Sequence, residues 1–254
     1  MDIKNSIPLV SIIMPAYNAA PFIEEAINSV ISQTVTDWEL FVIDDCSKDE
    51  TYQIAQRFAV NDSRITVLQN EVNSGVARTR NRAISCAEGQ YLAFIDSDDV
   101  WNPRKLELQL NKLQLTGAGI CYCSYRIVDV SGQSVKADYY VPETVGYEGL
   151  LKENCIQCSA MLIKTDIVKK FMFNTEFYHE DYILGLDMLR SGESAVGCKE
   201  LLLDWRYIEN SRSFNKKRST INRWKIYRDY LNLPLHKTIY VFLNYVIAGV
   251  RKYK

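Results

Sequence analysis

The stretch GQYLAFIDSDDVW, residues 89–101, decides how the rest of the chain is organised. An apolar run ends there in three carboxylates, Asp96, Asp98 and Asp99, which predicts a buried strand with acids at its end. In an open α/β sheet, ligands bind outside the carboxyl ends of the strands. Acids crowded at such an end repel one another unless a cation joins them. Because Mg²⁺ and Mn²⁺ take one or two carboxylates and complete their shell with phosphates, the stretch predicts a site for a divalent metal and a nucleotide diphosphate.

The same acids also have a structural explanation. Aspartate and serine favour turns and helix N-caps. Pro103 followed by RKLELQLNKLQL (104–115) predicts a helix that one acid of the cluster could cap. A cap uses only one acid, however.

Strand and helix patterns alternate through the first hundred residues. Short β-branched runs predict buried strands, and apolar residues at helical spacing predict the helices between them. Strands are expected at 9–14, 38–44, 64–70 and just before Asp96, and helices at 22–33, 51–59 and 73–89. This alternation predicts a mostly parallel α/β sheet with right-handed crossovers, whose strand ends build one pocket.

The pattern changes after residue 100. Residues 119–130 and 134–141 have strand-like patterns joined at Ser131 and Gly132, which predicts a hairpin. Residues 158–164 predict another strand. These elements would complete the sheet.

Length and charge limit the classes of protein. A chain of 254 residues with a net charge of −1 suits one large α/β domain with a small appendage. Twelve of the 30 Lys and Arg residues, but only two of the 31 Asp and Glu residues, lie from Arg206 onward. The body is therefore acidic and the tail basic. An acidic body without a reading motif argues against nucleic acid as a partner.

Cysteine use and hydropathy set the expected compartment. Seven cysteines, an odd number, fit a reducing compartment better than a disulfide framework. The CxxC of Cys155 and Cys158 has no second pair to make a zinc site, so core packing is favoured. The N-terminus does not have the pattern of a signal peptide, and no run approaches the ~20 apolar residues of a membrane span. We expect a cytoplasmic protein, soluble or peripheral on the inner face of the cytoplasmic membrane.

Glycine-rich phosphate loops are absent from the sequence. There is no GxGxxG after the first predicted strand and no GxxxxGK[ST] anywhere, which argues against a dinucleotide-binding fold and a P-loop. A nucleotide would instead be held by a tyrosine face, a carboxylate and a metal on the diphosphate.

Four segments together resemble the consecutive signatures of the family 2 glycosyltransferases of the GT-A fold. They are VSIIMPAYNAAPFIEEAINSVISQT (10–34), ELFVIDDCSKDET (39–51), NSGVARTRNRAI (73–84) and GQYLAFIDSDD (89–99) with its DxD motif. The resemblance implies a Rossmann-like, mostly parallel sheet flanked by helices. It also implies a metal-dependent, inverting transferase that uses a UDP-sugar.

The resemblance divides the chain into two expected domains. Residues 1–214 would form the glycosyltransferase domain, with a nucleotide-binding half (1–100) and an acceptor half (101–214). Residues 215–254 would form a basic, amphipathic helical tail.

The resemblance also implies which residues bind the donor. The expected nucleotide-sugar-binding residues are Pro15, Ala16, Tyr17, Asp45, Arg80, Asn81, Asp96 and Ser97. Among them Pro15, Tyr17 and Asp45 would hold uracil and ribose, and Asp96 would contact the ribose. Alone, Tyr17 would more often be a packing residue and Asp45 a turn residue, and only the arrangement of the motifs favours a binding role.

Metal binding and support of the donor pocket complete this set. Asp98, with Asp99 beside it, would ligate Mn²⁺ or Mg²⁺. Arg80 and Asn81 would support the donor pocket. Since Arg78, Arg80 and Arg82 alternate along a predicted helix, at least one of them must lie on the surface.

A second acidic pair lies in FYHEDYILGLDMLRSG, residues 177–192. Glu180 and Asp181 stand at the start of a predicted helix, where the helix dipole alone could account for them. Transfer to a sugar hydroxyl, however, needs a base that takes the proton of the alcohol. The pair resembles the Glu-Asp signature of the family, which implies Asp181 as this base and Glu180 as its alternate.

One position departs from the family pattern. Many relatives carry a His in a segment like WRYIENSRS (205–213), where it helps to hold the metal or the diphosphate. Ile208 stands at this place here. The third ligand is therefore open, and cationic or polar side chains could neutralise the phosphates instead. The candidates are Arg212, Ser213, Lys216 and Lys217.

The chain from residue 215 has two explanations. It reads as a basic helix, a break at Pro234, and a segment that is apolar on nearly every side. It could pack on the domain as a helix pair, or it could bind a membrane surface. In the second case Lys and Arg would contact anionic lipid and aromatic side chains would lie among the headgroups. These aromatic residues are Trp224, Tyr227, Tyr230, Tyr240, Phe242 and Tyr245.

The leading hypothesis is an enzyme that adds a sugar to a saccharide carried on a polyprenyl diphosphate. This reaction would serve bacterial O-antigen (lipopolysaccharide), capsule or exopolysaccharide synthesis. The alternative is a catalytically silent nucleotide-sugar-binding or scaffold protein of the same fold. A metal phosphatase or nucleotidyltransferase has no supporting nucleophile motif.

Overall fold

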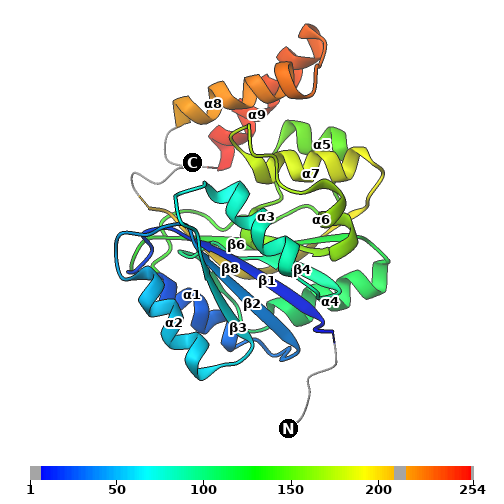
Figure 1. Ribbon diagram of the computed structural model, residues 1–254. Coiled ribbons are helices and arrows are strands. Elements are labelled where there is room, and N and C mark those ends of the chain that lie inside the picture. The colour runs from blue at the N-terminus through cyan, green and yellow to red at the C-terminus, as the bar shows by residue number, and fades with distance from the viewer. Residues whose placement is uncertain (1–6, 209–215, 253–254) are drawn as a thin grey trace.

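An eight-stranded sheet with helices on both faces forms the centre of the molecule (Figure 1). The computed structural model describes residues 7–208 and 216–252. The strands are β1 (Val10–Ala16), β2 (Trp38–Asp44), β3 (Ile65–Gln69), β4 (Tyr91–Phe94), β5 (Val100–Trp101), β6 (Ile120–Val128), β7 (Leu162–Lys164) and β8 (Ala195–Arg206). Their order across the sheet is β3-β2-β1-β4-β7-β6-β8-β5.

Helices cover both faces of this sheet. They are α1 (Ile23–Ile31), α2 (Thr51–Asn61), α3 (Val76–Cys86), α4 (Lys105–Thr116), α5 (Tyr147–Lys152), α6 (Thr165–Phe171), α7 (Glu180–Arg190), α8 (Lys216–Lys225) and α9 (Leu235–Lys252). Figure 1 shows α1, α2 and α4 on one face and α3, α5, α6 and α7 on the other. Each face has its own apolar core, and the two cores share the sheet.

The first four long strands confirm the predicted parallel half. β1 pairs in parallel with β2 and β4, and β2 pairs in parallel with β3. All seven residues of β1 are buried because helices cover both of its sides, which explains an apolar run without alternation. The register places Ala16 beside Asp44, so the loops after β1 and β2 start at the same edge. The sequence-based prediction of a mostly parallel α/β sheet is confirmed.

The second half joins the sheet through a short antiparallel strand. β7 pairs antiparallel with β4 on one side and with β6 on the other. β6 then pairs in parallel with β8, and β5 closes the edge with only two residues. Residues 158–160, predicted as the start of a strand, form a short 3₁₀ helix instead, and the strand begins at Leu162.

The predicted strand at 134–141 is wrong. The chain does turn at Gly132, which has a φ of +80°, after β6. The returning segment makes only two isolated antiparallel bridges, Tyr125 to Tyr139 and Val128 to Ser134. β8 occupies one edge of β6, and the segment touches the other edge at these two points without forming a ladder.

β8 itself was missed by the sequence analysis. Its apolar run is interrupted by the charged pair Lys199 and Glu200, which hides the strand pattern. The pairing with β6 shifts here, from Cys123 opposite Cys198 to Ser124 opposite Leu201. The two charged residues therefore lie in a bulge and stay exposed while the strand continues.

The two C-terminal helices lie against the domain at the upper end of Figure 1. Arg223 of α8, and Thr238 and Val241 of α9, are buried. The outer side of α9 carries a stripe of exposed apolar side chains, namely Leu235, Ile239, Leu243, Val246, Ile247 and Val250. Helix packing is thus observed, together with an apolar outer face. Among the described helices, none is both long and apolar enough to cross a bilayer.

Candidate active site

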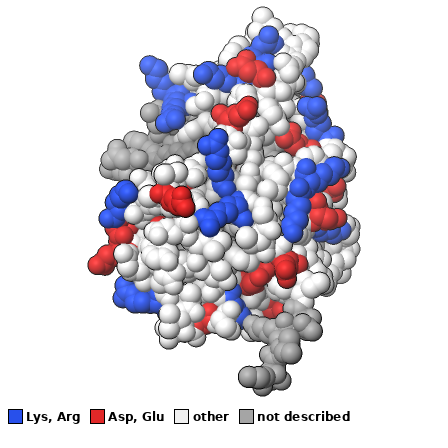
Figure 2. All heavy atoms as spheres, in the orientation of Figure 1, with Lys and Arg blue, Asp and Glu red and all other residues white. Residues whose placement is uncertain are grey.

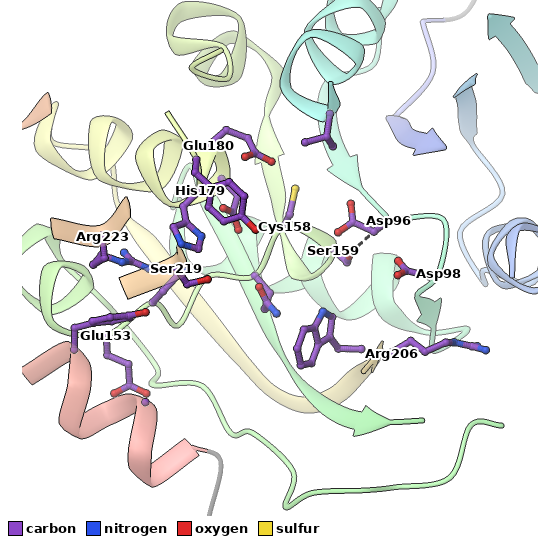
Figure 3. A pocket seen from close by; sticks show the side chains of 18 of the residues that line it. Asp96, Asp98, Glu153, Cys158, Ser159, His179, Glu180, Arg206, Ser219 and Arg223 are labelled. Atoms are coloured by element: carbon purple, nitrogen blue, oxygen red, sulfur yellow. Dashed lines mark hydrogen bonds between the residues drawn. The ribbon is translucent and has the colours of Figure 1, made fainter. Parts of the chain in front are cut away.

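A cavity of about 730 Å³ opens at the carboxyl ends of the parallel strands. Its walls come from the loops after β1 and β4, the 3₁₀ helix, the start of α7, the end of β8, and helices α8 and α9. Figure 3 shows Asp98 and Arg206 at one end and Arg223 and Glu153 at the other, with Glu180 and His179 between them. Segments that are far apart in the sequence thus share one space.

The cavity brings together most of the residues expected from the sequence. Those that line it are Pro15, Tyr17, Arg80, Asp96, Ser97, Asp98, Glu180 and Asp181. The other four expected residues do not belong to the described lining. They are Ala16, Asp45, Asn81 and Asp99. Both acidic motifs therefore face a single cavity.

Tyr17 lines the cavity and lies on a loop that hydrogen bonds hold to the start of α2. Its side chain is half exposed. The backbone amide of Ala19 donates to Thr51 Oγ1 at 2.7 Å, and that of Ala20 donates to Asp49 Oδ2 at 3.1 Å. These bonds tie the loop to the start of α2, so the tyrosine ring is held ready to stack on a flat ligand.

Asp45 does not line the cavity, but its carboxylate fixes the turn before α3. Its Oδ1 accepts from Asn70 Nδ2 at 2.7 Å and from the Ser74 amide at 2.8 Å, and its Oδ2 accepts from the Gly75 amide at 2.8 Å. Gly75 has a φ of +81°, a left-handed conformation that a residue with a side chain rarely adopts. Asp45 thereby shapes the turn that leads into α3, and its expected contact with the nucleotide stays a prediction.

The aspartate cluster is arranged in two layers. Asp96 and Asp98 face the cavity, whereas Asp99 is 1% exposed and its Oδ1 accepts from the Arg206 amide at 3.0 Å. Burial, and then the Asp96 carboxylate, raise the pKa of Asp98 to about 6. Burial, and then Asp98 and Asp96, raise the pKa of Asp99 well above its usual value. The charged cluster is therefore costly without a cation.

The cluster fits a divalent ion only together with a ligand. No three His, Cys, Asp or Glu side chains within residues 7–208 and 216–252 converge closely enough to hold a metal ion alone. Mg²⁺ and Mn²⁺ in nucleotide sites usually take one or two carboxylates plus phosphates, and this matches Asp98 in the cavity. The neighbouring Asp99 is buried, and its Oδ2 has no hydrogen-bond partner among the described residues.

Arg80 links the two acidic motifs. Its guanidinium donates to Asp96 Oδ1 at 2.5 Å and to Glu180 Oε1 at 2.9 Å, although the residue is only 3% exposed. Burial alone would lower the pKa of Arg80, but the neighbouring acidic groups raise it above its ordinary value. Arg78 is exposed on the same helix, as the alternation of the three arginines required. Arg80 is therefore an ion-pair bridge between the segments 1–100 and 101–214.

Asn81 makes a second link between these two segments. Its Nδ2 donates to the carbonyl oxygen of Phe173, and its Oδ1 accepts from the amide of Phe173, both at 2.8 Å. The ring of Phe173 lies 5.1 Å from the Arg80 guanidinium carbon. The Arg-Asn pair thus fixes α3 to the segment that precedes α7. Arg80 lines the cavity, whereas Asn81 supports it without being part of the lining.

Glu180 and Asp181 begin α7 at the middle of the cavity. His179, the residue before them, has a φ of +67°, which turns the chain sharply into the helix. Burial, and then the Glu180 carboxylate, raise the pKa of Asp181 to about 6, against the lowering effect of Arg80. An acid with this pKa is mostly deprotonated at neutral pH, so it can accept a proton.

The sequence analysis missed the contribution of the C-terminal helices to the cavity. Ser219 and Arg223 of α8 line it, as do Tyr245 and Val246 of α9. One signal was present: Arg223 shares a helix face with buried Ser219 and Tyr227, so it is a cation on the inner side of a helix. Among the expected substitutes for the missing His, Lys217 is exposed and does not line the cavity, and Arg212 and Ser213 lie outside the described residues.

Comparison of the sequence with known proteins shows which family the chain belongs to. The profile described as "Glycosyl transferase family 2" matches residues 11–178. The putative teichuronic acid biosynthesis glycosyltransferase TuaG of Bacillus subtilis is 34% identical over 245 residues, which are 96% of this chain and 97% of that protein. The Escherichia coli protein WfgD, "UDP-Glc:alpha-D-GlcNAc-diphosphoundecaprenol beta-1,3-glucosyltransferase", is 37% identical over 250 residues, 96% of this chain and 95% of that protein.

Solved structures share the fold. S. aureus TarS 1-349 in complex with UDP-GlcNAc superposes with a TM-score of 0.73 and 22% identity, over 93% of this chain and 71% of that chain. The mannosyltransferase PcManGT of Pyrobaculum calidifontis, in complex with GDP-Man and Mn²⁺, gives a TM-score of 0.72 and 17% identity, over 96% of this chain and 74% of that chain. At these identities the likeness establishes the architecture.

Proposed function

Because the chain belongs to glycosyl transferase family 2, we propose that it transfers a sugar from a UDP-sugar to a saccharide hydroxyl, with inversion at the anomeric carbon. The proposed acceptor is a saccharide on a polyprenyl diphosphate, used in bacterial surface-polysaccharide synthesis. The printed names of WfgD and TuaG support this substrate class. The observation that carries the proposal is the single cavity that holds Asp98 and Asp181, with Arg80 linking their motifs.

The donor is proposed to occupy the end of the cavity near Asp98. Tyr17 would stack on the uracil, and Asp96 would accept from the ribose. Asp98 would hold Mn²⁺ or Mg²⁺ against the diphosphate, with Asp99 adding negative charge from behind. A divalent ion bound there would stabilise the charge that develops on the departing UDP.

Asp181 is proposed to act as the general base. Its carboxylate takes the proton of the acceptor hydroxyl as the oxygen attacks the anomeric carbon. The new bond from this oxygen to the carbon forms on the face opposite UDP, the bond from the carbon to the phosphate oxygen breaks, and UDP leaves. Glu180 is held by Arg80, which keeps the start of α7 and its base in place.

One experiment tests the proposed function. UDP-sugars are screened for thermal stabilisation with and without Mn²⁺ or Mg²⁺, since a ligand that binds only the folded state raises its stability. The stabilising donor is then assayed for transfer to a GlcNAc-diphosphate-alkyl acceptor. Asp181→Asn should lower kcat by about 10²–10⁴-fold while donor-induced stabilisation persists.

The same experiment distinguishes an active transferase from a catalytically silent binding protein. Asp187→Asn is the matched control, because this acid lies on α7 but outside the cavity lining. Stabilisation without any transfer by the wild-type protein would favour a binding or scaffold role. Full transfer by Asp181→Asn would remove Asp181 as the base.

We also propose that the protein works at the inner face of the cytoplasmic membrane, where a lipid-linked acceptor would be found. The exposed apolar stripe on α9 supports this location. Lys217 and Arg218 are exposed on α8, and Figure 2 shows basic side chains gathered over that helix. Apolar side chains beside cations are the combination that binds an anionic lipid surface.

A further inference from the structure

Arg223 of α8 carries a buried positive charge that forms no close ion pair with a carboxylate of the described residues, although it lies near enough to Asp181 to act against the rise in the pKa of that acid. The residue is 3% exposed, and its Nε has no hydrogen-bond partner. Its guanidinium carbon lies 3.4 Å from the ring centroid of Tyr182 and 4.8 Å from that of Tyr245. Burial disfavours this charge, but the side chains of Tyr182, Tyr227 and Tyr245 favour it and raise the pKa of Arg223. The buried charge is thus held among aromatic side chains without a paired carboxylate.

The other two buried arginines that line the cavity are different. Arg80 pairs with Asp96 and Glu180, and Arg206 pairs with Glu25 at 2.7 Å. The Nε atoms of Arg80 and Arg206 also lack a hydrogen-bond partner, so the difference lies in the paired carboxylates that neutralise these two charges. Arg223 stands out because the fold places it in the same cavity without such a partner.

The position of Arg223 separates it from the expected donor. Figure 3 shows Asp98 at one end of the cavity and Arg223 at the other, with Glu180 between them. A diphosphate held at Asp98 therefore lies away from Arg223, on the far side of the proposed base. Ser219, one helical turn before Arg223, lines the same end and offers a hydroxyl donor.

The wall beside Arg223 is apolar and continues to the surface. It is formed by one side of α9, at Tyr245, Val246, Ala248, Gly249 and Val250. Val246 and Val250 are also 41% and 54% exposed, so they belong to both the cavity wall and the outer stripe of α9. A ligand with an anionic head and an apolar chain could follow this path out of the cavity.

One acid lies at the same end. Glu153 lines the cavity, and its Oε1 accepts from the Tyr139 hydroxyl at 2.6 Å. It forms no ion pair with Arg223 in the described structure. The Tyr182 side chain takes part of the hydrogen-bonding capacity of Arg223, and Nε is left without a partner. A planar guanidinium matches the oxygens of a phosphate.

We propose that Arg223, with Ser219, binds a phosphate group of the acceptor, and that the apolar side of α9 receives the start of its lipid chain. The inference rests on the proposed function and deepens it, since it assigns acceptor recognition to α8 and α9. Arg223 is a binding residue for the second substrate and takes no part in proton transfer.

Transfer kinetics test this assignment with three acceptors that carry the same sugar on the same alkyl chain. The sugar is joined through a diphosphate, through a monophosphate, or directly. Arg223→Met should raise KM for the diphosphate acceptor at least about tenfold, the loss expected for a hydrogen bond to a charged group. KM for the acceptor without phosphate, and KM for the donor, should each stay within about twofold. Arg223→Lys, which keeps the charge, should fall between.

Lys225→Met is the matched control for charge removal. Lys225 lies on the same helix but is exposed, so KM for every acceptor should match the wild type. An equal loss on all three acceptors in Arg223→Met would show a structural role and overturn the inference. A rise in donor KM alone would assign the charge to the donor and overturn it as well.

A binding measurement separates this inference from the proposed reaction. Thermal stabilisation by an alkyl diphosphate is measured in excess UDP, which occupies the donor end. Wild type and Lys225→Met should be stabilised, and Arg223→Met should not. This result without any sugar transfer would retain the anion site and reject the proposed function. Equal stabilisation of wild type and Arg223→Met would reject the anion site itself.

Discussion

The charge of Asp98, the proposed metal ligand, is unfavourable in the ligand-free fold. Burial and the neighbouring Asp96 raise the pKa of Asp98 to about 6, so its charged form destabilises the ligand-free fold. In the unfolded chain the group titrates near its ordinary value of 3.8. The folded state therefore holds more protons between these two values, and its stability falls as pH rises through them.

Asp98→Asn should accordingly stabilise the ligand-free protein at pH 7.5, because the amide resembles the neutral acid. We expect a rise in Tm of roughly 2–4 °C, the shift that 1 kcal/mol makes in a chain of this size. The gain should shrink below pH 6 and vanish near pH 4, where both carboxyl forms are neutral. Thermal unfolding across this pH range measures it.

An exposed acid serves as the comparison for Asp98. Asp37→Asn should leave Tm nearly unchanged at every pH, since Asp37 lies on the surface. Asp98→Asn should also lose the stabilisation that UDP and metal give to the wild type. A lower Tm for Asp98→Asn across the whole range would contradict the account of the cluster.

At the scale of elements, α3 is the part that ties the two halves together. Arg80 pairs with Asp96 after β4 and with Glu180 at the start of α7. Arg80→Met leaves two buried or half-buried acids without a partner, which should lower the free energy of unfolding by about 3–5 kcal/mol. Denaturant unfolding measures this loss, and Arg78→Met, an exposed change on the same helix, should cost little.

A double-mutant cycle identifies the bridge as the cause. Glu180→Gln in the Arg80→Met background should destabilise less than it does alone, because the charge it removes is already unpaired. Additive losses within about 0.5 kcal/mol would mean that the two side chains act independently.

The elements also show how far sequence reasoning reached. The strands and helices of the first hundred residues were predicted because uninterrupted apolar runs alternate with helical spacing there. β8 was missed because its bulge places two charges inside the run, and 134–141 was assigned wrongly because strand propensity does not reveal which edge of β6 is free. The cavity wall made by α8 and α9 could not be read from the sequence, since it depends on how two distant helices dock.

At the scale of the molecule, the outer face of α9 predicts where the protein resides. Replacing Leu243 and Ile247 together by Gln removes apolar area from the stripe but leaves the cavity lining intact. The doubly substituted protein should bind anionic vesicles at least about tenfold more weakly than the wild type, measured by flotation. Transfer to a short-chain acceptor in solution should be unchanged.

Val60→Gln gives the control for lost apolar surface. Val60 is 83% exposed on α2, on the other side of the sheet, so vesicle binding should equal that of the wild type. Equal flotation of all three proteins would remove α9 as the membrane-binding surface. Loss of flotation in Val60→Gln would show that the effect does not depend on position.

The two-residue strand β5 has a consequence for a protein gathered at high density on a surface. Unpaired strand edges recruit one another, and long flat edges are the starting points of aggregates. β5 consists only of Val100 and Trp101, so this strand itself offers a neighbouring copy almost no backbone to pair with. Crowding of copies should therefore not extend the sheet through β5.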